Sequence, residues 1–424
     1  MKLTTDQLAR KLIAELGAAA VFNDVERLAA RTVDGKLPSL VCLPATQEQL
    51  SAALRLCSEN QATIIPWGGG SAMAHGNPPR QLDVILGTER LHRVIDHDHA
   101  NLTATCESGV VLARLQEQLA AERQFVPFDP PFPERATIGG TIAANLNGPR
   151  RGCYGSVRDL VIGMKVTLIA GAQIKAGGKV VKNVAGYDMC KLFVGSLGTL
   201  GVINETTLRL APLAESATTM IAGGTFEQAR QLAAALDRSP LLPAAIFLSK
   251  DRDQESWRLA VGCEGFAEMI ERCRRNLAAL AAQAGMNAEF PRSGEADKFW
   301  RAAQNLPLQT GRLIFRIIVP RGEVFSSAGS LRRWPDGSIA ADLRSGTIWL
   351  SCGPTRSALE RFAELASLAR GQRGHAMIFA APSALKHGWE VWGESPPTLS
   401  LMRRIKQQFD PQDLLNPGRF LGGI

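Results

Sequence analysis

The chain has 424 residues, which is too long for one ordinary hydrophobic core and predicts two domains or more. Its 45% hydrophobic and 21% charged residues are typical of a soluble globular protein. The basic residues behind the formal charge of +8 are scattered, without a long basic run. This favours a mildly basic surface over a nucleic-acid site and leaves an acidic protein partner as the second choice.

The first residues and the cysteines bear on the compartment. Arg10, Lys11 and Glu15 stand where a signal peptide needs its apolar centre, so no export signal is expected. No run of 18 apolar residues is present to span a bilayer. The eight cysteines include no C-x-x-C pair, which excludes a ferredoxin-type cluster motif and a zinc ribbon. We therefore expect reduced thiols in the cytoplasm.

A helix and a strand lead into the first glycine-rich segment. Thr46 and Gln49 have capping-box spacing and predict the start of a helix, which the strand ATII and then PWGGGS at 66–71 follow. Three glycines in a row after a strand present backbone N–H groups to an anion. A plain tight turn is the alternative, and the loop alone would favour it.

Strands, an amphipathic helix and a proline-rich loop come next. Residues 83–98 and 101–110 predict strands joined by turns, and the loop at 127–133 cannot be a helix or a central strand. His97 and His99 alternate with aspartates, which could suggest a metal site. An exposed polar turn between two strands is the favoured interpretation, so we predict no metal.

Three more glycine-containing segments lie in otherwise apolar sequence. They are TIGGTIAAN at 137–145, GCYGSVRDLVIG at 152–163 and a run at 182–203 that ends in GSLGTLGVI. Glycine lets a backbone approach a ligand closely and adopt positive φ, so such clusters usually mark chain wrapped against a flat or phosphorylated cofactor. For the first of them, a helix start packed closely on a strand is the alternative.

The pattern of predicted elements changes after Pro212. A second capping box at Thr225 and Gln228, and an apolar stripe from Phe266 to Leu280, predict helices. Between and after them, strands are predicted that would form an antiparallel sheet backed by helices. These strands are AAIFLS at 244–249, WRLAVG at 257–262, LIFRIIVP at 313–320, TIWLSCG at 347–353 and HAMIFAAP at 375–382.

Two residues of this second region are candidates for binding or catalysis. Arg316 lies among apolar neighbours on a strand that should be covered, and a buried guanidinium must find an anion. A structural carboxylate and the carboxylate of a substrate are equally good partners. His375 heads a strand and is either a satisfied core histidine, which is favoured, or a base.

Together, and in this order, the glycine-rich segments resemble the FAD-binding domain of the vanillyl-alcohol-oxidase/p-cresol-methylhydroxylase (PCMH) superfamily. MRRIKQQFDPQDLLNPGRF at 402–420 resembles the C-terminal signature of its glycolate/D-lactate dehydrogenase branch. The resemblance covers roughly 40–212 and 398–420, and is greatest to the FAD-binding subunits of bacterial glycolate oxidases. It implies an α+β fold with a two-subdomain PCMH-type FAD-binding domain at 1–212, an antiparallel-sheet-and-helices cap domain for substrate or partner at 213–397, and a C-terminal segment at 398–424 that returns to the FAD domain.

The same resemblance implies non-covalent FAD, because Ser71 follows the glycines where members with covalently attached flavin often carry histidine. His75 is close enough in sequence to keep a covalent link as the alternative. Trp67 and Leu197 depart from the arginine and glutamate that the family often has there. A bulky side chain at Gly69 is expected to block the approach of the ligand. The residues implied to contact FAD are Pro66, Trp67, Gly68, Gly69, Gly70, Ser71, Thr137, Ile138, Gly139, Gly140, Ala143, Ala144, Asn145, Gly155, Ser156, Gly198, Gly201, Val202 and Ile203.

Two functions follow from the resemblance. The first is an FAD-dependent dehydrogenase that takes hydride from C2 of glycolate or a related small 2-hydroxy acid. It would work in a glycolate oxidase complex with a larger flavin-domain catalytic subunit and an iron–sulfur subunit. The second is a non-catalytic FAD electron-transfer and assembly subunit, which the absence of the family's His-rich motif H-x-G-D-G-N-x-H favours for the chemical step. A stand-alone FAD-dependent alcohol oxidase is a more distant alternative function. We expect the protein in the cytoplasm. The alternative is that the complex attaches it peripherally to the inner face of the cell membrane.

Overall fold

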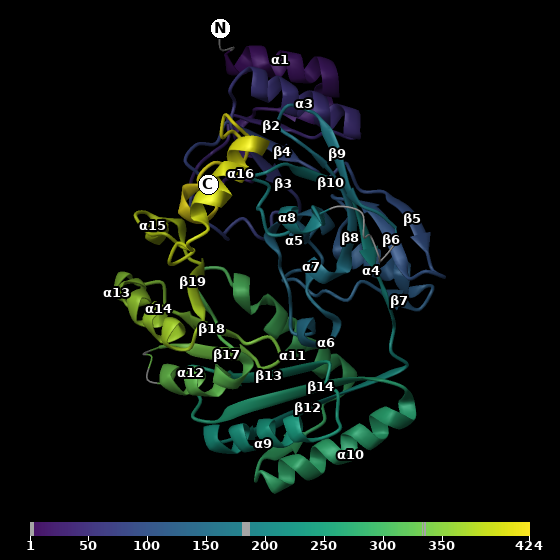
Figure 1. The fold of residues 1–424 in the computed structure, drawn as a ribbon, viewed down its shortest axis with the longest axis vertical. Helices are drawn as coiled ribbons and strands as arrows, with labels where there is room; N and C mark the ends of the chain where they lie inside the picture. The colour runs from purple at the N-terminus through teal and green to yellow at the C-terminus, as the bar shows by residue number, and fades with distance from the viewer. Residues whose placement is uncertain (1–3, 180–186, 333, 335) are drawn as a thin grey trace.

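The computed structural model of the chain describes residues 4–179, 187–332, 334 and 336–424. It has the predicted α+β architecture, in which two sheets with their helices form one half of the molecule and an eight-stranded sheet forms the other (Figure 1). The first residues of the glycine-rich run at 182–203, up to 186, lie outside the described ranges.

The first sheet has the strand order β1-β2-β4-β3, and β2, β4 and β3 run parallel. Alternate residues of β3 point to opposite faces, so Ile64 packs with α1 and α3 while Ile65 packs with α2. Helix α3 starts at the predicted position, where Thr46 Oγ1 accepts the Gln49 N–H at 3.2 Å, but Gln49 Oε1 accepts the Ala45 N–H at 2.8 Å and so does not complete the capping box. The elements are α1 (Thr5–Leu16), β1 (Val21–Phe22), α2 (Val25–Ala29), β2 (Leu40–Cys42), α3 (Gln47–Glu59), β3 (Ile64–Trp67) and β4 (Val84–Gly87).

The second sheet is antiparallel throughout, in the order β5-β6-β10-β8-β9. Its strands are β5 (Val94–Asp98), β6 (Thr103–Glu107), β8 (Val161–Thr167), β9 (Gln173–Gly177) and β10 (Val202–Arg209). Buried side chains such as Leu115, Ile142, Leu160 and Phe193 pack helices onto it. These helices are α4 (Leu112–Ala120), α5 (Ile138–Ala144), α7 (Val157–Leu160) and α8 (Cys190–Phe193). The short α6 (Arg151–Tyr154) and a ribbon of β7 (Gln124–Phe125) and β11 (Ala211–Pro212) complete this half.

The third sheet is antiparallel, in the order β15-β12-β14-β13-β17-β18-β16-β19. Every strand predicted after Pro212 is present, together with three that the sequence analysis did not predict, β12, β15 and β17. The bounds are β12 (Ser216–Gly224), β13 (Ala245–Lys250), β14 (Trp257–Gly265), β15 (Asn287–Glu289), β16 (Leu313–Ile318), β17 (Ser338–Asp342), β18 (Thr347–Cys352) and β19 (His375–Ala380).

Helices cover the outer face of this sheet, away from the other two sheets (Figure 1). They are α9 (Phe226–Arg238), α10 (Ala267–Gln283), α12 (Val324–Leu331), α13 (Arg356–Glu360) and α14 (Phe362–Gly371). The capping box of Thr225 and Gln228 starts α9 as predicted. The stripe of α10 is shorter than predicted, because Phe266 is 75% and Met269 49% exposed. Its buried residues begin at Ile270.

The inner face of the third sheet meets the other half of the molecule. Phe247, Trp349 and Phe379 from this face form one apolar cluster with Leu146, which follows α5. Helix α11 (Ser293–Asn305) packs on the same face through residues of the same cluster. Ligand sites often lie between two domains, on apolar surfaces that carry a few polar side chains. The inner face of the third sheet is such a surface.

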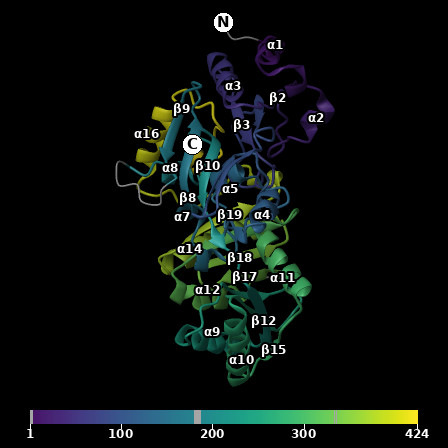
Figure 2. The same cartoon turned by 90° about the vertical axis from the view of Figure 1, so that its right-hand side faces the viewer.

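The last part of the chain returns to the first half. Helices α15 (Ser383–Lys386) and α16 (Leu399–Phe409) follow β19, and α16 lies beside α8 in both views (Figures 1 and 2). Phe409 packs edge-on against Phe193 with the ring centroids 5.6 Å apart. The Ile64 N–H then donates to the Leu414 carbonyl at 2.8 Å, and the Asn416 N–H to the Ile64 carbonyl at 2.7 Å, so this segment extends the first sheet beyond β3.

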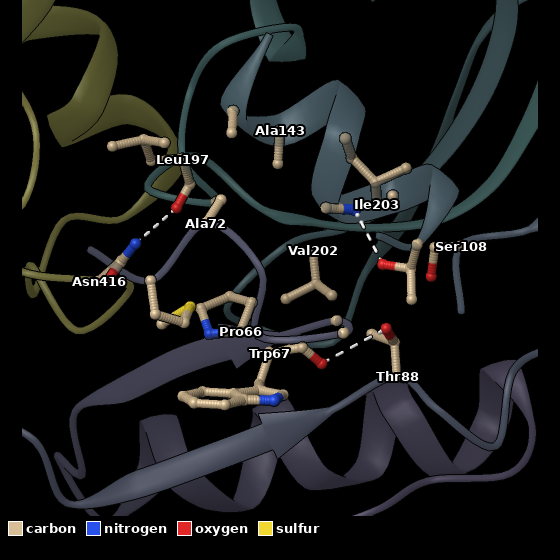
Figure 3. Close-up of a pocket in the computed structure, with 18 of the residues that line it drawn as sticks. Pro66, Trp67, Ala72, Thr88, Ser108, Ala143, Leu197, Val202, Ile203 and Asn416 are labelled. Carbon is tan, nitrogen blue, oxygen red and sulfur yellow. Dashed lines mark hydrogen bonds between the residues drawn. The ribbon is translucent and has the colours of Figure 1, made fainter. Parts of the chain in front are cut away.

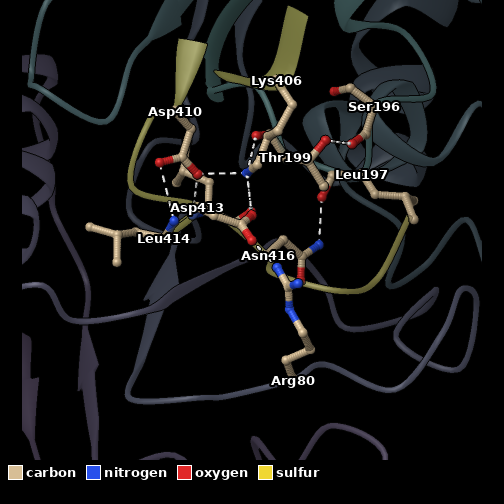
Figure 4. Close-up of polar contacts among 10 residues, drawn as sticks. Arg80, Ser196, Leu197, Thr199, Lys406, Asp410, Asp413, Leu414 and Asn416 are labelled. Atoms are coloured by element: carbon tan, nitrogen blue, oxygen red, sulfur yellow. Dashed lines mark hydrogen bonds and ion pairs between the residues drawn. The ribbon is translucent and has the colours of Figure 1, made fainter. Parts of the chain in front are cut away.

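A buried lysine fastens the returning segment. Lys406 Nζ donates to Asp410 Oδ2 at 2.6 Å, to the Thr199 carbonyl at 2.9 Å and to the Leu415 carbonyl at 3.0 Å (Figure 4). Asp410 in turn accepts the N–H groups of the segment, including that of Leu415 at 2.7 Å. Burial lowers the pKa of Lys406, and the Asp410 carboxylate opposes this shift. The pair therefore ties α16, the loop before β10 and the chain end together.

The sheet boundaries support the first division that we propose, at 212, since the third sheet starts at Ser216. The second proposed division, at 397, lies later than the first contacts of the returning segment, since the sheet ends at Ala380 and Lys386 already pairs with Asp34 at 2.8 Å. Among the helices of the described ranges, none combines the length and the apolar composition that crossing a bilayer requires.

We expect Lys406→Met to lower the free energy of unfolding by about 3–5 kcal/mol, because it leaves Asp410 buried without its cation. Arg404→Met on the exposed side of α16 is the matched control and should change stability little. Thermal unfolding followed by circular dichroism measures both. Equal melting temperatures for wild type and Lys406→Met would show that the pair does not hold the segment.

Candidate functional site

A cavity lies where the end of β3, the start of α5 and the turn before β10 meet (Figure 3). Asn416 and Arg419 of the returning segment supply another wall. Most of the residues predicted to contact FAD line it, namely Pro66, Trp67, Gly68, Gly69, Gly70, Ser71, Thr137, Gly139, Gly140, Ala143, Ala144, Gly198, Gly201, Val202 and Ile203.

The glycines after β3 are required by the loop itself. A Cβ atom at Gly69 would lie 1.6 Å from the carbonyl oxygen of Arg135. Gly70 has φ +69° and lies against the indole of Trp67, which points away from the cavity (Figure 3). A valine at Gly69 would therefore disrupt the loop before it could block a ligand. This corrects the expectation drawn from the sequence, since that substitution tests folding rather than flavin binding.

The same loop offers free hydrogen-bond donors. The backbone N–H groups of Gly69, Gly70 and Ser71 have no acceptor among the residues that the structure describes. Consecutive N–H groups in a turn form a concave site for an anion. The loop therefore suits a charged group such as the pyrophosphate of FAD.

Helix α5 presents its first turns to the cavity. Thr137 caps it, with Oγ1 accepting the Gly140 N–H at 3.3 Å. Gly139 packs closely on Ser108, the residue after β6, because a Cβ at Gly139 would lie 2.5 Å from Ser108 Cβ. A Cβ at Gly140 would meet only Thr137 Oγ1, at 3.1 Å, and otherwise enter the cavity. Glycine and the alanines of the next turn leave a flat wall that suits a planar ring.

The turn before β10 holds its shape through backbone contacts. Leu197 and Gly198 have φ values of +53° and +71°. The Leu197 N–H donates to the Ala143 carbonyl at 2.8 Å, and its carbonyl accepts from Asn416 Nδ2 at 2.6 Å (Figures 3 and 4). Leucine rarely adopts positive φ, so these two bonds offset local strain.

Four residues predicted to contact FAD do not line this cavity. Ile138 is fully buried in the core under the second sheet. Asn145 lines a second cavity described below. Gly155 and Ser156 line neither, and instead start α7, where Ser156 Oγ donates to Asp159 Oδ2 at 2.7 Å. Their glycine-serine pattern therefore marks the start of a helix and not a wall of the cavity.

Several lining residues were not singled out from the sequence. They are Ala72, Met73, Thr88, Ser108, Asn416 and Arg419. Ser108 Oγ and Asn416 Oδ1 are buried and have no hydrogen-bond partner in the described part of the chain. Asn416 and Arg419 belong to the NPGRF signature, and this signature could have identified them as site residues. Ser108 stands in an ordinary strand sequence that does not distinguish it from its neighbours.

Beside the cavity, buried cationic side chains outnumber the carboxylates that pair with them. Asp34 accepts from Lys386 at 2.8 Å and lies 3.4 Å from the Arg419 guanidinium, and all three side chains are buried. Two cations share this one carboxylate, and Arg419 Nε has no partner among the described residues. Burial lowers the pKa of Arg419 and of Lys386, so the cluster gains from a nearby anion.

The residues present fit FAD. The free N–H groups of the 69–71 loop match a pyrophosphate, the wall of Gly140 and the alanines matches a planar ring, and the unpartnered Ser108 Oγ and Asn416 Oδ1 offer polar contacts to the cofactor. The positive cluster around Arg419 complements the negative charge of the cofactor. The glycines thus serve both close packing of the protein and close approach of a ligand.

A second cavity lies between the inner face of the third sheet and the chain that follows α5. Arg316 from β16 enters it between the rings of Trp349 and Phe379, at 5.7 and 5.6 Å from their centroids. No carboxylate of the described residues forms an ion pair with Arg316, and its Nε has no partner. The structural carboxylate that the sequence allowed as a partner is therefore not found.

Other charged groups line this cavity as well. Arg151 was not singled out from the sequence, and its charge adds to burial in lowering the pKa of Arg316 to about 10. Arg316 still carries its proton at neutral pH. Asp342 accepts the Arg344 N–H at 3.0 Å, and burial raises the pKa of its carboxyl. The cavity therefore keeps a positive balance that an anionic ligand would neutralise.

The histidines do not form a catalytic cluster. His375 is exposed rather than in the core, and its Nε2 lies 2.7 Å from the Trp392 carbonyl. His75 is buried and stacks on Phe379 at 4.3 Å, and burial, followed by the charge of Arg316, lowers its pKa to about 3. His97 bonds to Gln124 at 3.0 Å. Within the described ranges, no group of three or more metal-ligating side chains is found.

We expect Gly140→Leu to abolish FAD binding without unfolding the protein, because the new side chain would fill the cavity while leucine favours a helix more than glycine does. Gly294→Leu is the control, since Gly294 lies at the exposed start of α11, where an added Cβ would meet no atom within 4 Å. Flavin absorbance per chain and circular dichroism measure the outcome. Full flavin content in Gly140→Leu would place the cofactor elsewhere.

Comparisons with known proteins agree with this geometry. Residues 38–177 match the FAD binding domain family, and residues 385–420 match the C-terminal domain of FAD linked oxidases. The glycolate oxidase subunit GlcD of Bacillus subtilis is 35% identical over 50% of this chain and 45% of its own length. The subunit GlcE of Escherichia coli is 29% identical over 88% of this chain and 96% of its own length. D-lactate dehydrogenase of Archaeoglobus fulgidus is 28% identical over 90% of each.

Solved structures share the fold. Alkyldihydroxyacetonephosphate synthase superposes with a TM-score of 0.77 at 15% identity, over 99% of this chain and 87% of its own. Substrate-bound p-cresol methylhydroxylase gives 0.73 at 16% identity, over 98% and 96%. The fold is thus the PCMH-type FAD-binding fold with its second domain, and the cofactor is FAD. The chain thus contains segments similar to the FAD binding and C-terminal domains of FAD linked oxidases, and it is similar over most of its length to proteins named as a glycolate oxidase subunit and a D-lactate dehydrogenase.

Proposed function

We propose that the chain is the FAD-binding subunit of a glycolate oxidase complex, which oxidises glycolate or a related small 2-hydroxy acid to the 2-oxo acid. Electrons would pass through the flavin to partner subunits. The single observation that carries this proposal is the half-buried Arg316, which has no ion partner among the described residues, has a buried Nε without an acceptor, and faces the second cavity.

Arg316 supports an acid as the ligand. Taking a guanidinium out of water costs several kcal/mol unless an anion is close, and the aromatic rings beside it offset only part of that cost. A carboxylate offers two oxygens that match the planar fork of arginine. A 2-hydroxy acid carries that group next to the carbon that is oxidised.

The two cavities share a wall, which supports a reaction between their occupants. Ala144 at the end of α5 lines the first cavity, and the next residue, Asn145, lines the second. When bound, FAD supplies the hydride acceptor. The chain itself would hold the acid through Arg316 and orient its C2 toward the first cavity. Asp342 lines the same cavity, and burial raises the pKa of its carboxyl, which is the direction of shift that a proton acceptor needs.

A second candidate function is electron transfer and assembly without catalysis by this chain. It is supported by the histidines, since none of those described lines the second cavity, and His375 is exposed. The relatives named as glycolate oxidase subunits support a complex. We propose a larger flavin-domain catalytic subunit and an iron–sulfur subunit as partners. A stand-alone FAD-dependent alcohol oxidase is the more distant alternative.

We further propose that FAD is held without a covalent bond and that the protein works in the cytoplasm, with peripheral membrane attachment through the complex as the alternative. Ser71 lies in the loop at the first cavity, where it cannot form the bond that a histidine makes. His75 packs between Phe379 and Trp392 and does not line that cavity. The eight cysteines are free thiols, which suits a reducing compartment.

We expect Arg316→Met to weaken oxalate binding to the FAD-loaded protein by roughly 30- to 150-fold, which corresponds to about 2 to 3 kcal/mol for one charge-assisted contact. Because no partner charge would be left behind, the melting temperature should stay or rise. Isothermal titration calorimetry and thermal unfolding measure the two effects. Arg275→Met, on the exposed side of α10, is the control. A lower melting temperature with unchanged oxalate affinity would refute the substrate role.

The two candidate functions differ in what the isolated chain can do. Without a histidine at the second cavity, we expect little or no glycolate dehydrogenase activity from the chain alone, and activity when the partner subunits are co-expressed. Dye-linked glycolate oxidation measures both preparations. Robust turnover by the isolated chain would overturn the electron-transfer function and leave the enzymatic one.

A further inference from the structure

Two cysteines face each other in the core of the third sheet. Cys263 lies on β14 and Cys273 on α10, and their Sγ atoms are 2.8 Å apart. Both are free and buried, with 3% and 5% of their surfaces exposed. No other two sulfur atoms in the described ranges form a hydrogen bond. The site is unrelated to either cavity discussed above.

The separation of the sulfurs is unusually short for two thiols. Non-bonded carbon atoms prefer roughly 3.5–4.0 Å, and sulfur is larger than carbon. A disulfide bond measures about 2.05 Å. At 2.8 Å the two atoms need only a small movement to bond. Ile270 and Leu277, one turn to either side on α10, are buried in the same core and hold the helix face in place.

We propose that Cys263 and Cys273 are a reversible oxidation site, at which hydrogen peroxide converts the two thiols to a disulfide. One thiolate attacks the peroxide, the O–O bond breaks, and a sulfenic acid and the first water form. The second thiol then displaces the hydroxyl group of the sulfenic acid as the second water, and the S–S bond forms. Two electrons pass from the sulfurs to the peroxide oxygens, and the thiol protons leave in the two waters.

One member of this pair lies next to a third cavity. Cys263 and its neighbours Gly262 and Glu264 line this cavity between the two halves of the molecule, while the Cys263 sulfur packs against Cys273 in the core beneath α10. The hydrogen bond with Cys263 lowers the pKa of Cys273, which favours Cys273 as the group that reacts first. Cys153 is exposed but has no sulfur neighbour with which to close a disulfide.

The bond would act on the contact between the halves. Glu264, next to Cys263 on β14, accepts from Tyr154 Oη at 2.6 Å and lies 3.7 Å from the Arg150 guanidinium. Both partners belong to the FAD-binding half. A disulfide would fasten β14 to α10 and thereby limit the movement of the strand that carries Glu264.

The test uses the full chain loaded with FAD and treated with hydrogen peroxide. After blocking with iodoacetamide and unfolding, free thiols should fall by two, and non-reducing peptide mass spectrometry should find the Cys263–Cys273 cross-link. The melting temperature should rise on the order of 5 °C and return after dithiothreitol. Cys153→Ser should behave like wild type, and Cys263→Ser should show neither cross-link nor rise.

Mass spectrometry of the wild type decides the matter even where Cys263→Ser folds poorly. Peroxide that leaves both thiols free while Cys153 is oxidised overturns the proposal. A cross-link that joins other cysteines overturns it too. So does a rise in melting temperature that Cys263→Ser retains.

Discussion

The docking of the chain end onto β3 is the interaction on which the site depends. Two backbone hydrogen bonds join Ile64 to Leu414 and Asn416, and the buried pair of Lys406 and Asp410 holds the segment there. This brings Asn416 against the Leu197 carbonyl and Arg419 against the glycine loop. One wall of the flavin cavity therefore comes from residues about 350 positions beyond the loop that they face. Loss of this contact would open the cavity without touching a glycine.

Uncompensated positive charge recurs at both cavities. Asp34 cannot neutralise both Lys386 and Arg419, and Arg316 has no carboxylate partner among the described residues. Buried cations destabilise a fold unless an anion pairs with them. The protein therefore carries an electrostatic cost that negatively charged ligands would remove, and ligand binding should stabilise it. FAD and a small carboxylic acid are ligands of this kind.

Local patterns predicted much of this molecule. Helices start at Thr46 and Thr225 as expected, with the capping box complete at Thr225, and the glycine segments lie mostly at one cavity. Gly155 and Ser156 did not, because their pattern equally describes a helix start. The sequence could not show that Arg316 lacks a partner, since that depends on which distant carboxylates the fold brings close. Nor could the sequence identify Ser108 as a lining residue of the cavity, since its place there follows from the close packing of Gly139 on it.

The most direct test of the account is the flavin content of the purified chain after acid precipitation. The glycine loop with its free N–H groups, and Ser71 in place of a histidine, predict FAD in the supernatant in an amount equal to that of the chain. Flavin that stays with the precipitated protein would contradict non-covalent binding. A chain that contains no flavin, and takes up none when FAD is added, would contradict the assignment of the cavity itself.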